Sequence, residues 1–131
     1  MEQAIRRAFR ERTGLDSART AWIGGSATWG ARCPEDFASQ VEVVHFDGFE
    51  TPFGRSIAWK LLVSEGAPIL RVRMHGWHRN NPDLDYSHTL QVFYVLHALG
   101  VEQAIVDASV GGITAKPWDV VIPDDFLTLD Q

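Results

Sequence analysis

Two short apolar runs, far apart in the chain, each lead directly into a turn of small residues rich in glycine and serine. The first spans residues 22–26 (WIGGS) and the second spans residues 105–113 (IVDASVGGI). A buried strand that opens into such a turn exposes backbone N–H groups, and these groups can hold an anion. A histidine-rich segment lies between the two turns. The pattern therefore predicts an anion-binding site built from the ends of two strands.

Composition excludes several classes of protein. The 131 residues are 45% hydrophobic and 22% charged, which fits one globular domain with a real core. A formal net charge of −5 argues against nucleic acid as a partner, because phosphate backbones require a basic surface. No apolar run reaches the length of a membrane span, and the N-terminus lacks the apolar region of a signal peptide. We therefore expect neither a nucleic-acid nor a membrane partner.

Cysteine and histidine usage bears on the cellular compartment and on metal binding. The chain has a single cysteine, Cys33, so no disulfide can form within it. A reduced, cytoplasmic location is the simplest expectation for such a chain. The five histidines and the cysteine show no spacing typical of metal ligands, so no metal site is predicted.

The hydrophobic pattern predicts an α/β domain. Helical spacing covers residues 2–13, with Gly14 as a stop, and again residues 86–99, with Gly100 beyond the end. β-rich runs predict strands at 20–24, 41–46, 57–63, 69–74, 104–106 and 119–122. Strands followed by a strand–helix–strand unit indicate a mixed β-sheet flanked by helices. We divide the chain into an N-terminal helical extension, residues 1–19, and a second unit, residues 20–131.

Six segments, in order, resemble motifs of the purine nucleoside phosphorylase family, of the methylthioadenosine phosphorylase type. They cover residues 20–128: the turn 23–26 (IGGS), the hairpin turn 51–56 (TPFGRS), the segment 73–76 (RMHG), the helix 86–100 ending in leucine-glycine, the turn 107–112 (DASVGG) and the strand 116–122 (KPWDVVI). The resemblance implies the first half of the nucleoside phosphorylase fold.

The resemblance also implies a reaction and a set of binding residues. In such an enzyme phosphate attacks the anomeric carbon of a purine nucleoside, so phosphate is a co-substrate and no cofactor is expected. Backbone N–H groups, hydroxyls and a cation hold the phosphate by preorganised electrostatics. Carried onto this sequence, the phosphate- or substrate-binding residues are Gly25, Ser26, His75, Ala108 and Ser109. The resemblance assigns no catalytic residue here.

Each of these side chains also has a plainer interpretation. Ser26 can simply form the turn in which it lies, and Ser109 can belong to an ordinary tight turn. A lone histidine such as His75 is more often a structural hydrogen-bonding group than a ligand contact. The aromatic residues Phe53 and Trp59 are predicted to lie in the core.

Two positions depart from the family pattern at the expected phosphate site. Met74 stands where the family has a phosphate-binding arginine, the bidentate and permanently charged partner for such an anion. Arg73 would point to the opposite face of a regular strand, which leaves Arg79 as the candidate substitute cation. Asp107 brings a carboxylate to the second turn and would repel phosphate if it faced inward.

A third departure concerns the later family segments, which hold the sugar and the purine. None of them is present in this sequence. A half-fold would expose a sheet edge and the apolar faces of its last strands. We therefore expect either a second subunit that carries the C-terminal half, in a trimer-based assembly like those of the family, or self-association of the chain to cover the gap.

These expectations combine into one leading function and two alternatives. The leading hypothesis is a subunit of a split purine nucleoside phosphorylase that contributes the phosphate-binding half of the site. The chain would then act as a glycosyltransferase only when a partner completes it. The alternatives are a non-catalytic binding or regulatory module with the same fold, and a hydrolase-like relative that uses water in place of phosphate. The base and the 5′ substituent of the sugar stay open.

Overall fold

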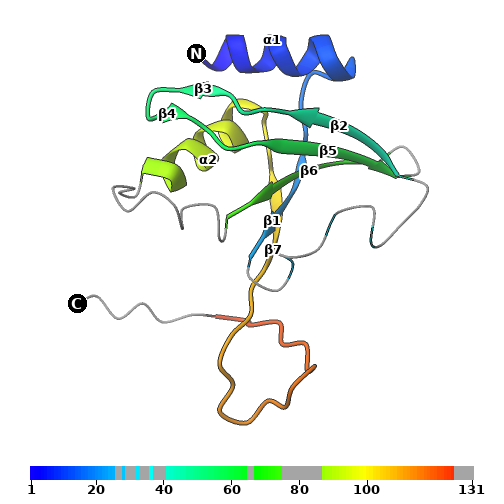
Figure 1. Cartoon of the computed structure of the whole chain (residues 1–131), viewed down its shortest axis with the longest axis vertical. Helices are drawn as coiled ribbons and strands as arrows, with labels where there is room; N and C mark the ends of the chain where they lie inside the picture. The colour runs from blue at the N-terminus through cyan, green and yellow to red at the C-terminus, as the bar shows by residue number, and fades with distance from the viewer. Residues whose placement is uncertain are drawn as a thin grey trace.

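The computed structural model describes residues 1–25, 28, 32, 36, 41–64, 67–74 and 87–125. Within these residues the elements follow in the order α1 (Glu2–Thr13), β1 (Thr20–Gly24), β2 (Glu42–Phe46), β3 (Glu50–Thr51), β4 (Gly54–Arg55), β5 (Trp59–Ser64), β6 (Ala67–Arg73), α2 (Ser87–Ala98) and β7 (Gln103–Asp107) (Figure 1). The predicted helices and all but one of the predicted strands are confirmed, with ends that move by one or two residues.

A five-stranded sheet in the order β2-β5-β6-β1-β7 forms the centre of the described part of the chain. β1 pairs in parallel with both β6 and β7, whereas β5 pairs antiparallel with β6 and with β2. The predicted mixed sheet is therefore confirmed. Because β6 and β7 lie on either side of β1, the chain passes through α2 from one neighbour of β1 to the other.

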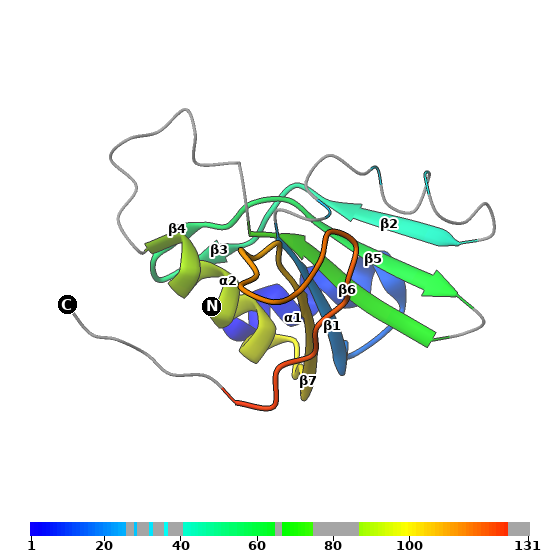
Figure 2. The ribbon, with the colours of Figure 1, turned by 90° about the horizontal axis from the view of Figure 1, so that it is seen from below.

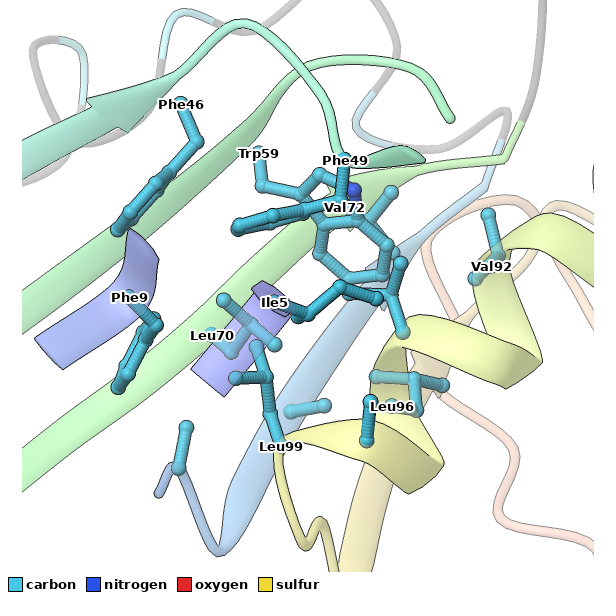
Figure 3. Close-up of a cluster of buried hydrophobic side chains, with 14 of the residues drawn as sticks. Ile5, Phe9, Phe46, Phe49, Trp59, Leu70, Val72, Val92, Leu96 and Leu99 are labelled. Atoms are coloured by element: carbon cyan, nitrogen blue, oxygen red, sulfur yellow. The ribbon is translucent and has the colours of Figure 1, made fainter. Parts of the chain in front are cut away.

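One hydrophobic core lies between the sheet and the two helices. Ile5 and Phe9 of α1 and the apolar face of α2 join the same cluster as Trp59 of β5 (Figure 3). Phe9 stacks on Phe46 of β2 with 5.6 Å between the ring centroids. Both helices therefore cover the same face of the sheet.

The chain after β7 lies on the other side of the strands. Figure 1 places α1 above the sheet and the segment that follows β7 below it. In Figure 2, seen from below, α1 is behind the strands and that segment is in front of them.

No helix in the described ranges has the length and apolar character needed to cross a bilayer.

Glycines end both helices, as their sequence positions predict. Gly14 follows α1 with a φ of 72°, and its N–H donates to the carbonyl of Arg10. Gly100 follows α2 with a φ of 71°. Left-handed backbone of this kind is nearly free of strain only for glycine.

The prediction that Phe53 lies in the core is wrong, whereas the one for Trp59 is confirmed. Trp59 is 1% exposed and its indole N–H donates to the Ser56 hydroxyl, but Phe53 is 42% exposed. Phe53 lies in the tight turn between β3 and β4, where Thr51 bonds to both its N–H and the Gly54 carbonyl. The turn holds its ring outside the core, edge-on to Tyr94.

The prediction of a strand at residues 119–122 is also wrong. The Asp119 N–H donates to the Lys116 carbonyl, and the Lys116 N–H donates to the Asp119 carboxylate, so a turn spans residues 116–119 and residues 119–122 form no strand. Val120, Val121 and Ile122 are exposed and make no ladder with any strand that the structure describes. β-branched residues form a strand only where a neighbouring strand supplies hydrogen-bond partners.

The expected exposed sheet edge is confirmed at β7. Within the described part of the chain β7 is the last strand of the sheet, paired with β1 alone. Ile105 and Val106 point to opposite faces, yet each is 63% exposed. Unpaired backbone groups flanked by exposed apolar side chains are a template for association.

The contacts of α1 predict that this helix is needed for stability, whether or not residues 1–19 count as an extension. Phe9 is fully buried, so the substitution Phe9→Ala should cost about 3–5 kcal/mol of unfolding free energy through the cavity that it leaves. Urea denaturation followed by circular dichroism measures the loss. Gln3→Ala, on the exposed face of the same helix, is the control and should change stability by less than about 0.5 kcal/mol. Equal stabilities of the two variants would show that α1 contributes nothing to the core.

Candidate functional site

Three strand ends meet at one edge of the sheet. Gly24, the last residue of β1, pairs with Arg73 of β6 on one side and with Asp107 of β7 on the other. The N–H of Met74 donates to the Gly24 carbonyl at 2.9 Å, which extends this alignment by one residue. The carboxyl ends of parallel strands are the usual place for ligands in α/β sheets. The two glycine turns are therefore neighbours in space, and the segment after β6 begins beside them.

The carboxylate of Asp107 ties these strand ends together. Its Oδ1 accepts from the backbone N–H of Gly25 at 3.1 Å, and its Oδ2 accepts from the indole Nε1 of Trp22 at 2.7 Å. The hydroxyl of Thr28 lies 3.1 and 3.0 Å from the two carboxylate oxygens. A carboxylate that accepts several hydrogen bonds fixes the groups around it.

The orientation of Asp107 bears directly on the expected phosphate site. From the sequence, this carboxylate is expected to repel phosphate if it faces inward, and in the structure it faces the first glycine turn, at Gly25. The Gly25 N–H, predicted to bind phosphate, donates to a carboxylate of the chain itself. A negative charge therefore already lies at the position where the N–H group would meet an external anion, and like charges repel.

The two glycine turns are in direct contact. A Cβ atom built on Gly25 would overlap the backbone carbonyl oxygen of Asp107 and would lie 3.3 Å from the Cα of Ala108. Glycine is therefore required at this position by the approach of the second turn. Ala108 lies at this contact, and Ser109 follows it on an exposed stretch of chain.

The remaining predicted contacts lie outside the described residues. These are Ser26 and the two candidates that follow β6, His75 and Arg79. Their roles at the anion site stay predictions. The structure does place the residues that precede two of them: Gly25 comes directly before Ser26, and Met74 comes directly before His75.

Met74 lies on the core face of the sheet, whereas Asp107 lies on the opposite face. Its side chain is half-buried and packs against the hydrophobic core. The alternation of β6 places Leu70 and Val72 on the core face, and Arg71 and Arg73 on the other. The predicted opposition of Arg73 and Met74 fits this alternation, and Arg73 is exposed.

Arg71 is a buried cation beside the three strand ends that was not among the residues predicted from the sequence. Its guanidinium lies over the ring of Trp22, with 4.4 Å between Cζ and the ring centroid. The signal was present in the sequence, because an arginine stands between two core residues in the run 69–74 (ILRVRM). The sequence does not show that Trp22 is its partner, because these two residues become neighbours only when β1 pairs with β6.

Other polar features lie elsewhere. The pKa of Asp36 is held below its usual value by hydrogen bonds from the backbone and side chain of Arg32, and the hydrogen bond to Glu102 raises the pKa of Arg19. Both ion pairs are solvent-exposed.

Among the described residues no cluster of histidine, cysteine and carboxylates could hold a metal ion. A groove of about 300 Å³ runs between α2 and β7, lined by Phe93, Leu96, His97 and residues 101–104.

Comparison with known proteins gives one weak structural similarity. No protein-family model matches the chain. No curated protein sequence matches it either. In a search of solved structures, the chain is similar to a methylthioadenosine phosphorylase from an antarctic soil metagenomic library, at 25% sequence identity and a TM-score of 0.44. The similarity covers 70% of this chain and 30% of that protein, so the chain matches less than a third of its length.

The contact between the two turns predicts that Gly25 tolerates no side chain. Gly25→Ala should lower the unfolding free energy by about 1–3 kcal/mol, because the new methyl group must displace the backbone at Asp107. Thermal denaturation checks this. Gly111→Ala is the matched control, since a Cβ at Gly111 meets nothing within 4 Å, and we expect no loss of stability. A Gly25→Ala protein as stable as wild type would mean that the turns are not held in contact.

Proposed function

We propose that this chain is one component of a purine nucleoside phosphorylase-type enzyme, to which it contributes the phosphate-binding part of the site. The observation that carries the proposal is the meeting of three strand ends, at Gly24, Arg73 and Asp107. The segments that resemble the family's phosphate-binding motifs begin at these same strand ends. A random assortment of short motifs would have no reason to converge on one edge of a sheet.

The proposed chemistry is phosphate-dependent cleavage of an N-glycosidic bond. Phosphate attacks the anomeric carbon of a purine nucleoside, the C–N bond breaks, and the purine leaves with the bonding electrons. Hydroxyl, imidazole and backbone donors from Ser26, His75, Ala108 and Ser109 would hold the phosphate. The Gly25 N–H could join them only if Asp107 released it.

A second polypeptide is part of this proposal because β7 offers an open edge. The segment after β7 also carries exposed apolar side chains, namely those of Val110, Ile113, Trp118, Val120, Val121 and Ile122. Surfaces of this kind mark protein–protein contacts. We propose that the partner adds a strand to β7, covers these side chains and brings the residues that bind the sugar and the purine.

Asp107 favours one other candidate function, a hydrolase-like relative in which water replaces phosphate. The carboxylate faces the first glycine turn and repels phosphate, a multiply charged nucleophile, but it does not repel water. The two functions share the nucleoside and the cleaved bond, and they differ in whether base release requires phosphate.

The open edge predicts self-association of the isolated chain or complex formation with its partner. In sedimentation velocity, the recombinant chain should be larger than a monomer of 14.7 kDa. Ile105→Lys, which places a charge on the exposed edge strand, should shift the distribution toward monomer. Ala58→Lys, at an exposed position before β5, should leave the distribution unchanged. A wild-type chain that sediments as a stable monomer, alone and in extracts of its source cells, would contradict the partner proposal.

The reaction predicts base release by the complex isolated with its native partner. Inosine, adenosine and methylthioadenosine are incubated with and without inorganic phosphate, and free purine is measured by chromatography. Release that depends on phosphate supports the phosphorylase, and release without phosphate supports the hydrolase-like alternative. If the complex releases no base under either condition, both enzymatic proposals fail.

A further inference from the structure

We propose that Arg71 binds an oxyanion, side-on, through the edge of its guanidinium formed by Nε and Nη2. The site lies on the face of the sheet that carries Trp22 and Asp107, beside the end of β1. This inference deepens the proposed function, on which it rests for the identity of the anion as phosphate. It supplies the cation that Met74 does not.

The first observation is that a buried charge has unused donors. Arg71 is 3% exposed, and neither its Nε nor its Nη2 has a hydrogen-bond partner in the part of the chain that the structure describes. Buried polar groups are almost always hydrogen-bonded, and a buried charge without acceptors is strongly unfavourable. Two unpaired donors on one buried guanidinium indicate an acceptor that the described part of the chain does not supply.

The second observation is which two donors are unpaired. Nε and Nη2 form one edge of the guanidinium, and that edge is the one that carboxylates and phosphates engage with two N–H groups. This chain uses the same edge elsewhere. Arg32 directs Nε and Nη2 at a carboxylate oxygen of Asp36, at 3.2 and 2.9 Å, and Arg19 directs both at Glu102. Arg71 presents the same edge, and no carboxylate among the described residues engages it.

Trp22 holds that edge in place. The guanidinium lies over the indole ring at 4.4 Å, an arrangement that stabilises the cation through the ring face. Stacking occupies the flat face of the guanidinium but leaves its N–H groups, which lie in the plane, free to donate. Trp22 is itself fixed because its Nε1 donates to Asp107 at 2.7 Å. The cation is therefore preorganised by a chain of contacts from Asp107 through Trp22 to Arg71.

The glycine at position 24 makes room for the guanidinium itself. A Cβ at this position would lie 3.4 Å from Nη2 of Arg71 and 2.9 Å from the hydroxyl oxygen of Thr28. Any side chain here would crowd the guanidinium edge and the group that lies opposite to it. The glycine at the end of β1 therefore serves the cation as well as the turn.

Asp107 sets the charge balance of this site. Its carboxylate lies on the Trp22 indole N–H and provides one negative charge near the one positive charge of Arg71. The negative charge of this carboxylate repels any oxyanion that binds Arg71. Removing the negative charge with Asp107→Asn should therefore strengthen binding of an oxyanion, provided that Arg71 is the cation.

The test is titration calorimetry of the full chain, or of its native complex, with inorganic phosphate in one arm and acetate in the other. The two arms distinguish phosphate from a carboxylate ligand. Arg71→Gln should weaken binding of the preferred anion by about 10-fold or more, since hydrogen bonds to a charged group are lost. Arg73→Gln, which removes an exposed arginine two residues along the same strand face, is the control and should change affinity less than about 2-fold. Asp107→Asn should tighten binding.

A variant that retains the charge guards against misfolding of Arg71→Gln. Arg71→Lys keeps the cation but has no planar edge, so it should fold and bind more weakly than wild type. Circular dichroism establishes which variants are folded. The proposal is overturned if wild type binds neither anion, or if a folded Arg71 variant binds as tightly as wild type. Phosphate binding that depends on Arg71, in a complex that releases no purine, would sustain this site and refute the proposed reaction.

Discussion

The parallel pairing of β1 on both sides determines where a site can form in this chain. A strand with two parallel neighbours has its carboxyl end level with theirs, and here the register aligns Gly24 with Arg73 and Asp107. The core face of β1 is apolar, with Ala21 and Ile23 buried in the same cluster as residues of both helices. The opposite face is then free to carry polar groups. Any shift of this register by one residue would separate the turns and exchange the two faces.

The sheet face away from the helices is organised around a carboxylate and a cation that share one aromatic ring. Trp22 donates its indole N–H to Asp107 and offers its ring face to Arg71. Asp107 in turn satisfies the Gly25 N–H, so the first glycine turn is already occupied by an anion that belongs to the chain. This arrangement has a consequence for ligand choice. In the proposed site, an external anion meets two donors of Arg71 that have no partner among the described residues, whereas the Gly25 N–H already donates to Asp107.

The sequence predicted most of the fold because local patterns and the final structure agree. Glycines at positions 14 and 100 end the helices as expected, and the apolar runs around Trp22 and Ile105 form parallel strands that open into turns. It also predicted which residue types gather at the strand ends. It could not predict that Arg71 is buried while Arg73 is exposed, since this difference arises from what packs on the sheet rather than from the strand alone. The roles of Ser26, His75 and Arg79 stay predictions.

The failed prediction of a strand at residues 119–122 and the open edge of β7 have the same physical cause. Valine and isoleucine favour a strand only when another strand provides the ladder, and the described part of the chain provides none to Val120 or Ile122. The segment that carries them begins directly after Asp107 and passes through Ala108 and Ser109. A partner that pairs with β7 would therefore contact the same stretch of chain that forms the second turn. Because Gly25 and Asp107 are in contact across the two turns, a partner that displaced the backbone at Asp107 would also displace the first turn.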